Sequence, residues 1–314
     1  MTGSEKTARL NGTTISVLLN DQSGKKDAGP NADDIETAFQ RLGHAVRVVP
    51  FDPNRALEDT IADLLRDDPE TIVAAGGDGT ISGVAQALLG KQCHFGILPR
   101  GTFNYFARSL GIPQDLDGAA QIIAQGQTRP LRIAMLNGQT FLNNANLGLY
   151  PQILRSREDI YDFWGRSRAA AYWSALKVLF QWPKPLVITI RADAEEKTLR
   201  TPMIFVLNNA FQLRQMGMEG ADCIEEGRLA MLIAPDQGRL GMLKSAVAML
   251  MGRAARHRDF HLLCATDFEV RAQRRNLLVA RDGERCRMTG PFHFALSDDT
   301  LQTLVPTDPK GDVR

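Results

Sequence analysis

Short turn-forming segments follow three predicted strands near the start of this chain, and this pattern constrains the fold most. The strands are runs of apolar, mostly β-branched residues: 14–19, 71–75 and 95–98. The segments that follow them are Asn20–Gly24, Gly76–Thr80 and Arg100–Thr102. A stretch with helical periodicity comes after each segment, and strands that alternate with helices are typical of a doubly wound, mostly parallel sheet with helices on both faces.

The second half has a different pattern. From Phe141 onward, strand-like runs follow one another mostly without intervening helices, which favours an antiparallel sheet or sandwich. These runs are 186–190, 203–207, 229–233, 268–270 and 277–280. Helical periodicity interrupts them at about 160–180 and 240–256. We therefore expect a nucleotide-binding α/β domain over 12–132 and a β-rich domain with inserted helices over 133–299.

Composition excludes several classes of protein. With 314 residues and 44% hydrophobic content, the chain can bury a large core, so a small disulfide-stapled scaffold is excluded. Because 37 basic side chains balance 36 acidic ones, nothing indicates a nucleic-acid partner. The start of the sequence lacks the apolar region of a signal peptide, and no apolar run approaches the ~20 residues that span a bilayer. These observations predict a cytoplasmic location.

The four cysteines are widely spaced and form no CxxC pair. They are Cys93, Cys223, Cys264 and Cys286. No histidine stands near them at the spacing of a zinc site. We expect all four to be reduced, mostly buried thiols.

The turn-forming segments also predict where ligands bind. The carboxyl ends of parallel strands meet at one edge of a sheet, where glycine-rich turns bring backbone N–H groups close to a phosphate. Asp78 lies between two glycines, and a carboxylate beside phosphates indicates a bound cation. An ordinary strand-to-helix turn also contains Gly and Asp, but a given five-residue string arises by chance only about once per million positions. The sequence thus indicates Mg²⁺ and a nucleoside triphosphate, without the GxxxxGK[ST] motif of a P-loop.

Longer motifs resemble one family. Gly76–Thr80 is followed by Leu98-Pro99-Arg100-Gly101-Thr102-Phe103-Asn104-Tyr105-Phe106-Ala107-Arg108 and by Leu110–Pro113. Together they resemble the bacterial diacylglycerol kinase catalytic-domain family, whereas the GGDGT string alone is shared with NAD kinases. Phe141–Gly148 and Asp282-Gly283-Glu284 resemble further segments of that family.

This resemblance implies an NAD kinase-like first domain that binds ATP, a sandwich that faces the lipid, and an active site in the cleft between them. It implies that a late segment, about 300–308, returns to complete the first domain. Asp78 would hold Mg²⁺, and Glu284 would accept the proton of the lipid hydroxyl. The candidate nucleotide-binding residues are Asn20, Ser23, Gly24, Gly76, Gly77, Asp78, Gly79, Thr80, Gly101 and Thr102.

Three positions depart from the family's pattern. Asp21 stands where the family usually has proline, and Ser82-Gly83 stands where it has Asn-Glu. Glu225-Glu226-Gly227 replaces an Asp-Asp-Gly that helps to hold a structural Mg²⁺ in many members. Glu226 is the candidate ligand at that second site, although its longer side chain would need a different backbone path.

Two stretches combine apolar and basic residues. Residues 160–182 contain tryptophans among arginines, and 240–260 contain leucines and methionines with Lys244, Arg253 and Arg256. Either stretch suits contact with an anionic membrane surface. For 160–182, packing of the aromatic rings on the sandwich is the favoured interpretation. Residues 240–260 are the better membrane candidate, although they are equally typical of a helix that packs on the core with a solvated basic edge. His257 and His261 share a helical spacing but have no third ligand, which favours surface histidines.

The leading hypothesis is an ATP- and Mg²⁺-dependent kinase that phosphorylates a hydroxyl of a membrane lipid, diacylglycerol or a related one. One alternative is a kinase for a soluble substrate, of the NAD kinase type. The other is a non-catalytic nucleotide- or lipid-binding regulator, which the departures at Ser82-Gly83 and Glu226 motivate. The sequence leaves the acceptor lipid and the oligomeric state open, because acceptor pockets are built from variable loops.

Overall fold

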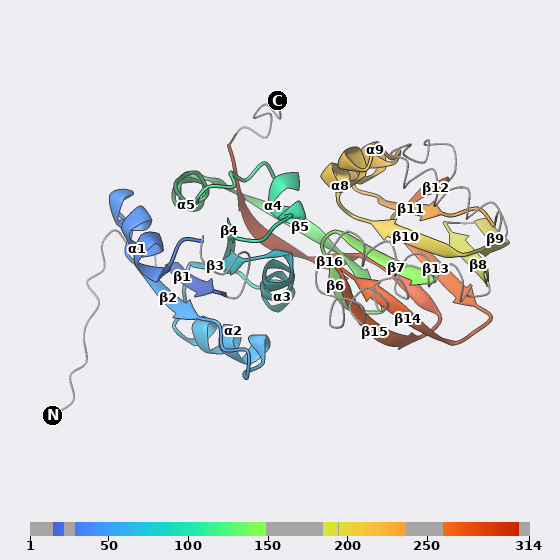
Figure 1. Ribbon diagram of the computed structural model, residues 1–314, viewed down its shortest axis with the longest axis horizontal. Helices are drawn as coiled ribbons and strands as arrows, with labels where there is room; N and C mark the ends of the chain where they lie inside the picture. The colour runs from blue at the N-terminus through green and yellow to red at the C-terminus, as the bar shows by residue number, and fades with distance from the viewer. Residues whose placement is uncertain (1–14, 22–28, 149–184, 194, 237–259, 308–314) are drawn as a thin grey trace, which may run out of the picture. The chain divides into compact units, whose positions relative to one another are not determined.

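The computed structural model describes residues 15–21, 29–148, 185–193, 195–236 and 260–307 (Figure 1). The chain divides into two compact units. The first unit comprises Met1–Ile133 and Ser297–Arg314, and the second comprises Ala134–Leu296.

The first unit contains a parallel sheet. Its elements are β1 (Ile15–Leu19), α1 (Ala32–Arg41), β2 (Val46–Pro50), α2 (Leu57–Arg66), β3 (Thr71–Gly76), α3 (Asp78–Leu88), β4 (His94–Pro99), α4 (Tyr105–Ser109) and α5 (Leu116–Gln125). The strand order is β2-β1-β3-β4, and every pair in it is parallel. Strands β1, β3 and β4 are almost entirely buried, as expected for a sheet with helices on both faces.

The helices of this unit pack in two pairs, α1 with α5 and α2 with α3 (Figure 1). Helix α1 begins with a capping box, in which Asn31 Oδ1 accepts from Asp34 N at 3.0 Å and Asp34 Oδ2 accepts from Asn31 N at 2.9 Å. Because β1 has β2 on one side and β3 on the other, the strand order reverses at β1. Ligands of such sheets bind at the carboxyl ends of the strands beside this reversal.

The second unit is a sandwich of two sheets. Strand β5 (Gln127–Leu136) begins in the first unit and ends in the second. The further elements are β6 (Gln139–Phe141), β7 (Asn144–Gly148), β8 (Leu186–Ala192), β9 (Glu195–Thr201), β10 (Met203–Leu207), α8 (Ala210–Gln215), α9 (Ala221–Glu225), β11 (Leu229–Ile233), β12 (His261–Ala265), β13 (Asp267–Ala272), β14 (Asn276–Arg281), β15 (Glu284–Thr289) and β16 (Phe292–Val305). One sheet has the order β16-β13-β8-β9 and the other β12-β11-β10-β7-β14-β15. Side chains from both sheets form one buried cluster, which includes Leu147, Val279, Phe268 and Phe294.

Strand β16 contributes to both units. Residues Phe292–Ala295 pair antiparallel with β13 in the second unit. Further along the same strand, Thr303 pairs with Phe95 of β4 in a parallel arrangement within the first unit. Leu301, Thr303 and Leu304 are buried there, so the last strand supplies part of the first unit's core.

The predicted fold class is confirmed: an α/β unit with a parallel sheet precedes a unit with antiparallel sheets. Strand β9 was not predicted, because its sequence Glu-Glu-Lys-Thr-Leu-Arg-Thr is nearly all polar. It is an edge strand that pairs only with β8 among the described strands, so most of its side chains are exposed. The helical stretches predicted at 160–180 and 240–256 lie outside the described residues.

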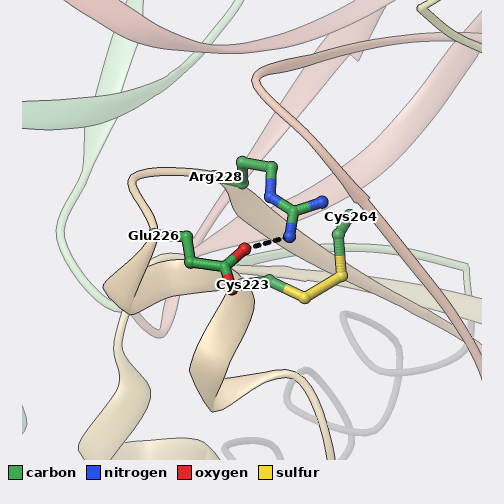
Figure 2. Close-up of a disulfide and its surroundings, with 4 residues drawn as sticks. All are labelled: Cys223, Glu226, Arg228 and Cys264. Carbon is green, nitrogen blue, oxygen red and sulfur yellow. Dashed lines mark hydrogen bonds and ion pairs between the residues drawn. A yellow bond between two sulfur atoms is a disulfide. The ribbon is translucent and has the colours of Figure 1, made fainter.

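The expectation of four reduced thiols is wrong for two of them. Cys223 of α9 and Cys264 of β12 form a disulfide with a Cα–Cα distance of 5.9 Å (Figure 2). The two cysteines are 41 residues apart in the sequence, and they meet because α9 and β12 both lie against β11. Cysteine spacing alone does not show such a contact. Cys93 and Cys286 are free, and burial raises the pKa of the Cys93 thiol to about 11, so that thiol is protonated at neutral pH.

We expect the disulfide to stabilise the second unit when it is oxidised. Closing a loop of this length lowers the entropy of the unfolded chain by the equivalent of about 4 kcal/mol. Thermal unfolding of the oxidised protein should therefore occur at a higher temperature than unfolding with a reductant present. The double variant Cys223→Ser/Cys264→Ser should unfold at the lower temperature under both conditions, and a reductant effect that persists in this variant would contradict the prediction.

Candidate functional site

Three strand ends of the first unit lie side by side. Asn20, the residue after β1, donates its backbone N–H to Ala75 O of β3 at 2.9 Å. Arg100, after β4, donates its N–H to Gly76 O at 2.8 Å. The Asn20 amide Nδ2 also donates to Thr80 Oγ1 at 2.8 Å. The structure thus brings the first-strand segment, the GGDGT loop and the start of the second loop to one edge of the sheet.

The GGDGT loop leads directly from β3 into α3. Gly77 is the N-cap of the helix, and no side chain caps it. A Cβ at Gly76 would lie 2.6 Å from Thr80 Cβ, so the close turn requires glycine at this position. The N-cap residue therefore offers no side-chain acceptor to the first N–H groups of this 11-residue helix. Such N–H groups at the edge of a sheet favour binding of an anionic ligand.

Asp78 is the first residue of α3 and is partly exposed. Its Oδ1 accepts a hydrogen bond from Phe106 N at 3.4 Å, which connects the start of α3 to α4. Burial, and secondly the charge of Asp78, raise the pKa of the neighbouring Tyr105 hydroxyl. The carboxylate is therefore held at the edge of the site, close to the N-terminus of a helix.

The second loop is held by Asn104. This buried residue has the left-handed backbone conformation, with φ at 50°, which asparagine tolerates better than most residues. Its Oδ1 accepts from Gly101 N at 2.8 Å, and its Nδ2 donates to Gly101 O at 3.0 Å and to Gln114 Oε1 at 3.0 Å. Thr102 is exposed beside this clamp. The sequence motif that contains Asn104 indicated no role for this residue.

The two loops touch at glycines. A Cβ at Gly101 would lie 2.8 Å from Gly77 Cα and 2.7 Å from Asn104 Oδ1. We expect Gly101→Ala to destabilise the protein by about 1–3 kcal/mol, because the backbones must move apart. Gly79→Ala is a matched control, since nothing lies within 4 Å of its Cβ position. Thermal unfolding of both variants checks this, and equal midpoints would contradict it.

In the second unit, Asp282 and Gly283 form the turn between β14 and β15. Both residues have positive φ, 44° and 91°. The Asp282 carboxylate accepts backbone N–H groups from Leu142 at 2.7 Å, Asn143 at 2.8 Å and Asn144 at 3.1 Å. Glu284 is the first residue of β15, opposite Arg281, and it is exposed. The sequence motif indicated no structural role for Asp282.

A network of amide side chains adjoins this turn. Asn209 Nδ2 donates to Asn143 Oδ1 at 2.7 Å, and Asn146 Nδ2 donates to Asn144 Oδ1 at 2.7 Å. Asn144 Nδ2 in turn donates to Gln212 Oε1 at 3.0 Å. This network was not predicted, although three asparagines within four residues of a predicted strand are an unusual signal.

Comparison with known proteins finds a similar family for the first part of the chain. Residues 14–136 match the sequence profile described as the diacylglycerol kinase catalytic domain. This segment is therefore similar to the diacylglycerol kinase catalytic-domain family. It contains the Asn20 strand end, the GGDGT loop, Gly101 and Asn104.

Curated relatives match part of the chain. The diacylglycerol kinase of Bacillus subtilis (strain 168) is 34% identical over 140 residues, which is 42% of this chain and 45% of that protein. A probable lipid kinase, YegS-like, of Klebsiella pneumoniae (strain 342) is 48% identical over 87 residues, 27% of this chain and 29% of that protein. These alignments span less than half of the length of each relative.

The fold likeness extends further than the sequence match. A solved structure described as a putative diacylglycerol kinase from Bacillus anthracis str. Sterne has a TM-score of 0.70 at 18% identity. The alignment covers 95% of this chain and 99% of that one. Both units therefore share the fold of this diacylglycerol kinase structure.

Other predicted site residues are placed as follows. Glu226, after α9, is exposed and forms an ion pair with Arg228 (Figure 2). Within the described residues, no group of three or more His, Cys, Asp or Glu side chains could hold a metal ion. The metal-ligand role of Glu226 stays a prediction. Ser23 and Gly24 lie outside the described residues, as does His257, while His261 is an exposed residue of β12.

Residues 14–136 carry groups that are chemically suited to nucleotide phosphates. The backbone N–H groups at the start of α3 can donate to phosphate oxygens. The Asp78 carboxylate and the Thr80 hydroxyl are oxygen ligands of the type that Mg²⁺ takes together with phosphates. The residues present therefore fit a Mg²⁺–nucleotide complex.

Proposed function

We propose that this chain is an ATP- and Mg²⁺-dependent kinase that transfers a phosphoryl group to a hydroxyl of a membrane lipid, diacylglycerol or a related one. The observation that carries this proposal is the contact between the GGDGT loop and the Gly101 loop at one sheet edge, within a segment similar to the diacylglycerol kinase catalytic-domain family. The names of the curated relatives, diacylglycerol kinase and probable lipid kinase, support the class of reaction.

Each candidate residue has a role in this proposal. Gly76, Gly77, Gly79 and Gly101 let the backbone approach the phosphates, and the N-terminus of α3 stabilises their charge. Asp78 holds Mg²⁺, which neutralises charge on the phosphates when it is bound. Glu284 accepts the proton of the acceptor hydroxyl.

Contact with a membrane is part of the proposal, since the acceptor is a lipid. Among the described residues, no helix is both long and apolar enough to cross a membrane. We propose peripheral contact with an anionic surface, to which Lys244, Arg253 and Arg256 contribute by charge. Vesicle sedimentation should then show binding to anionic vesicles that weakens as salt rises, because exposed charges are screened.

The test is phosphorylation of a total lipid extract. The protein is incubated with labelled ATP, Mg²⁺ and vesicles of extracted bacterial lipid, and the labelled product is identified. We expect a labelled phospholipid that is absent without Mg²⁺. Labelling of NAD in a parallel reaction, with none of lipid, would favour the soluble-substrate kinase, and ATP binding without any labelled product would favour a non-catalytic regulator.

A further inference from the structure

The side chain of Arg100 reaches across the sheet edge of the first unit. Its backbone N–H is bonded to β3, and its Nη1 lies 3.2 Å from Asp21 Oδ1, after β1. Its Nη2 would lie only 2.7 Å from a Cβ at Gly29, just before α1. The Arg100 guanidinium therefore lies against Asp21 and Gly29, the two described residues that flank 22–28. The backbone of Arg100 belongs to the loop that contains Gly101.

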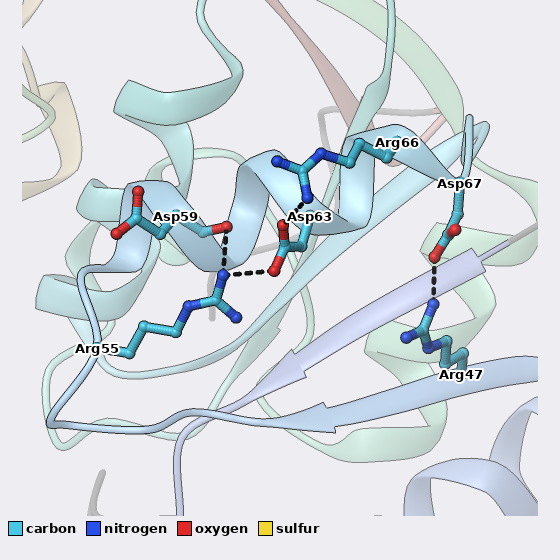
Figure 3. Close-up of polar contacts among 6 residues, drawn as sticks. All are labelled: Arg47, Arg55, Asp59, Asp63, Arg66 and Asp67. Atoms are coloured by element: carbon cyan, nitrogen blue, oxygen red, sulfur yellow. Dashed lines mark hydrogen bonds and ion pairs between the residues drawn. The ribbon is translucent and has the colours of Figure 1, made fainter.

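The burial of this guanidinium is unusual for an ion pair with a surface carboxylate. The Arg100 side chain is 7% exposed, whereas its partner Asp21 is 67% exposed. Its Nε atom is buried and has no hydrogen-bond partner among the residues that the structure describes, which is costly for a charged group. An ordinary surface pair of the same unit, Arg47 with Asp67, keeps both side chains exposed, at 60% and 55% (Figure 3).

Arginine suits this position better than lysine does. A planar guanidinium with several donors can lie against two separate chain segments at once, whereas an ammonium is a point charge. The carboxylate of Asp21 fixes its orientation through a charge-assisted hydrogen bond.

We propose that Arg100 is a positioning residue for the nucleotide site and that Asp21 orients it. Arg100 holds the end of β1 and the start of α1 against the two glycine loops, in the arrangement that binds ATP phosphates. This inference rests on the proposed use of ATP, and it adds two residues that set nucleotide affinity. Because they act on ground-state binding, the pair affects the KM for ATP more than kcat.

The test measures ATP affinity by calorimetry with the full chain and no lipid. The variants are Arg100→Gln, Asp21→Asn, the double variant, and Arg47→Gln as the matched control, which breaks an exposed pair. We expect each single change to raise the Kd for ATP about tenfold, since a misplaced loop weakens a preorganised site. The double variant should be no weaker than Arg100→Gln, because the two residues act as one unit. Arg47→Gln should bind ATP as the parent does.

Kinetics and stability separate positioning from a general loss of structure. At saturating ATP, kcat of Asp21→Asn should stay within about twofold of the parent, with a raised KM for ATP. Arg100→Lys should recover part of the affinity, because the pair with Asp21 can re-form. If Arg100→Gln fails to fold, the Asp21→Asn result decides, since that variant keeps the buried side chain.

Three results would overturn the proposal: unchanged ATP affinity in both single variants, additive losses in the double variant, or an equal loss in Arg47→Gln. A parent protein that binds no ATP would also overturn it. If the parent binds ATP and the variants weaken binding as expected but no lipid is labelled, the positioning role is supported and the lipid kinase activity is refuted. The two proposals can therefore fail separately.

Discussion

Replacing Asp78 by asparagine is expected to remove Mg²⁺-dependent phosphoryl transfer while the fold remains intact. Asparagine has the same shape, and its Oδ1 can still accept the hydrogen bond from Phe106 N. The variant lacks the negative charge that would hold Mg²⁺ beside the phosphates, and charge stabilisation by the metal contributes several kcal/mol to such reactions. We expect the turnover rate to fall by at least about 10²-fold.

The measurement is the rate of lipid phosphorylation at several Mg²⁺ concentrations, together with the unfolding midpoint. Asp117→Asn is a matched control, because Asp117 is also an acidic residue in the first turn of a helix, α5. The control should phosphorylate lipid at the parental rate. If Asp78→Asn also does so, the interpretation of the GGDGT loop as a Mg²⁺–nucleotide site is wrong.

The second large effect is expected at Glu284. A lipid hydroxyl is a poor nucleophile at neutral pH, and a general base typically accelerates such a step by ~10²- to 10⁴-fold. Glu284 is exposed at the start of β15, so its carboxylate has no backbone function that glutamine would disturb within the described hairpin. We expect Glu284→Gln to bind ATP and fold normally but to lose phosphorylation by at least about 10²-fold.

Two further variants make this test specific. Glu195→Gln is the matched control, because Glu195 is likewise an exposed first residue of the second strand in a hairpin of the second unit. Asp282→Asn removes the charge that accepts three backbone N–H groups, so it should lower the unfolding midpoint. Equal rates for Glu284→Gln and the parent from pH 6 to 9 would exclude Glu284 as the base.

Local sequence signals predicted the first unit well because each element there carries its own signal. The run Thr71–Ala75 is fully buried and β-branched at its start, and the glycines after it mark the turn into α3. The antiparallel core strands were also found, since runs such as Leu229–Ile233 are apolar throughout. Edge strand β9 lacks a run of apolar residues, because most of its side chains are exposed to solvent and are polar.

The site was predicted only as far as its glycine loops. No local pattern could show that Arg100 pairs with Asp21, which lies 79 residues away in the sequence, or that Asn104 clamps Gly101. The disulfide was missed for the same reason, since it depends on how α9 and β12 flank β11. Contacts between distant segments depend on the order of the strands in the sheets, and the sequence pattern does not predict that order.

The path of β16 has a consequence for how the protein forms in the cell. Residues 297–305 belong to the first unit, yet they are synthesised after the whole second unit. A ribosome-bound chain that ends before them lacks Leu301 and Leu304 in the first unit's core and leaves the β4 edge without its partner at Thr303. The amino-terminal unit therefore cannot complete its core until the second unit and residues 297–305 have been synthesised. A nascent chain of this kind depends on protection of the open β4 edge until the last strand arrives.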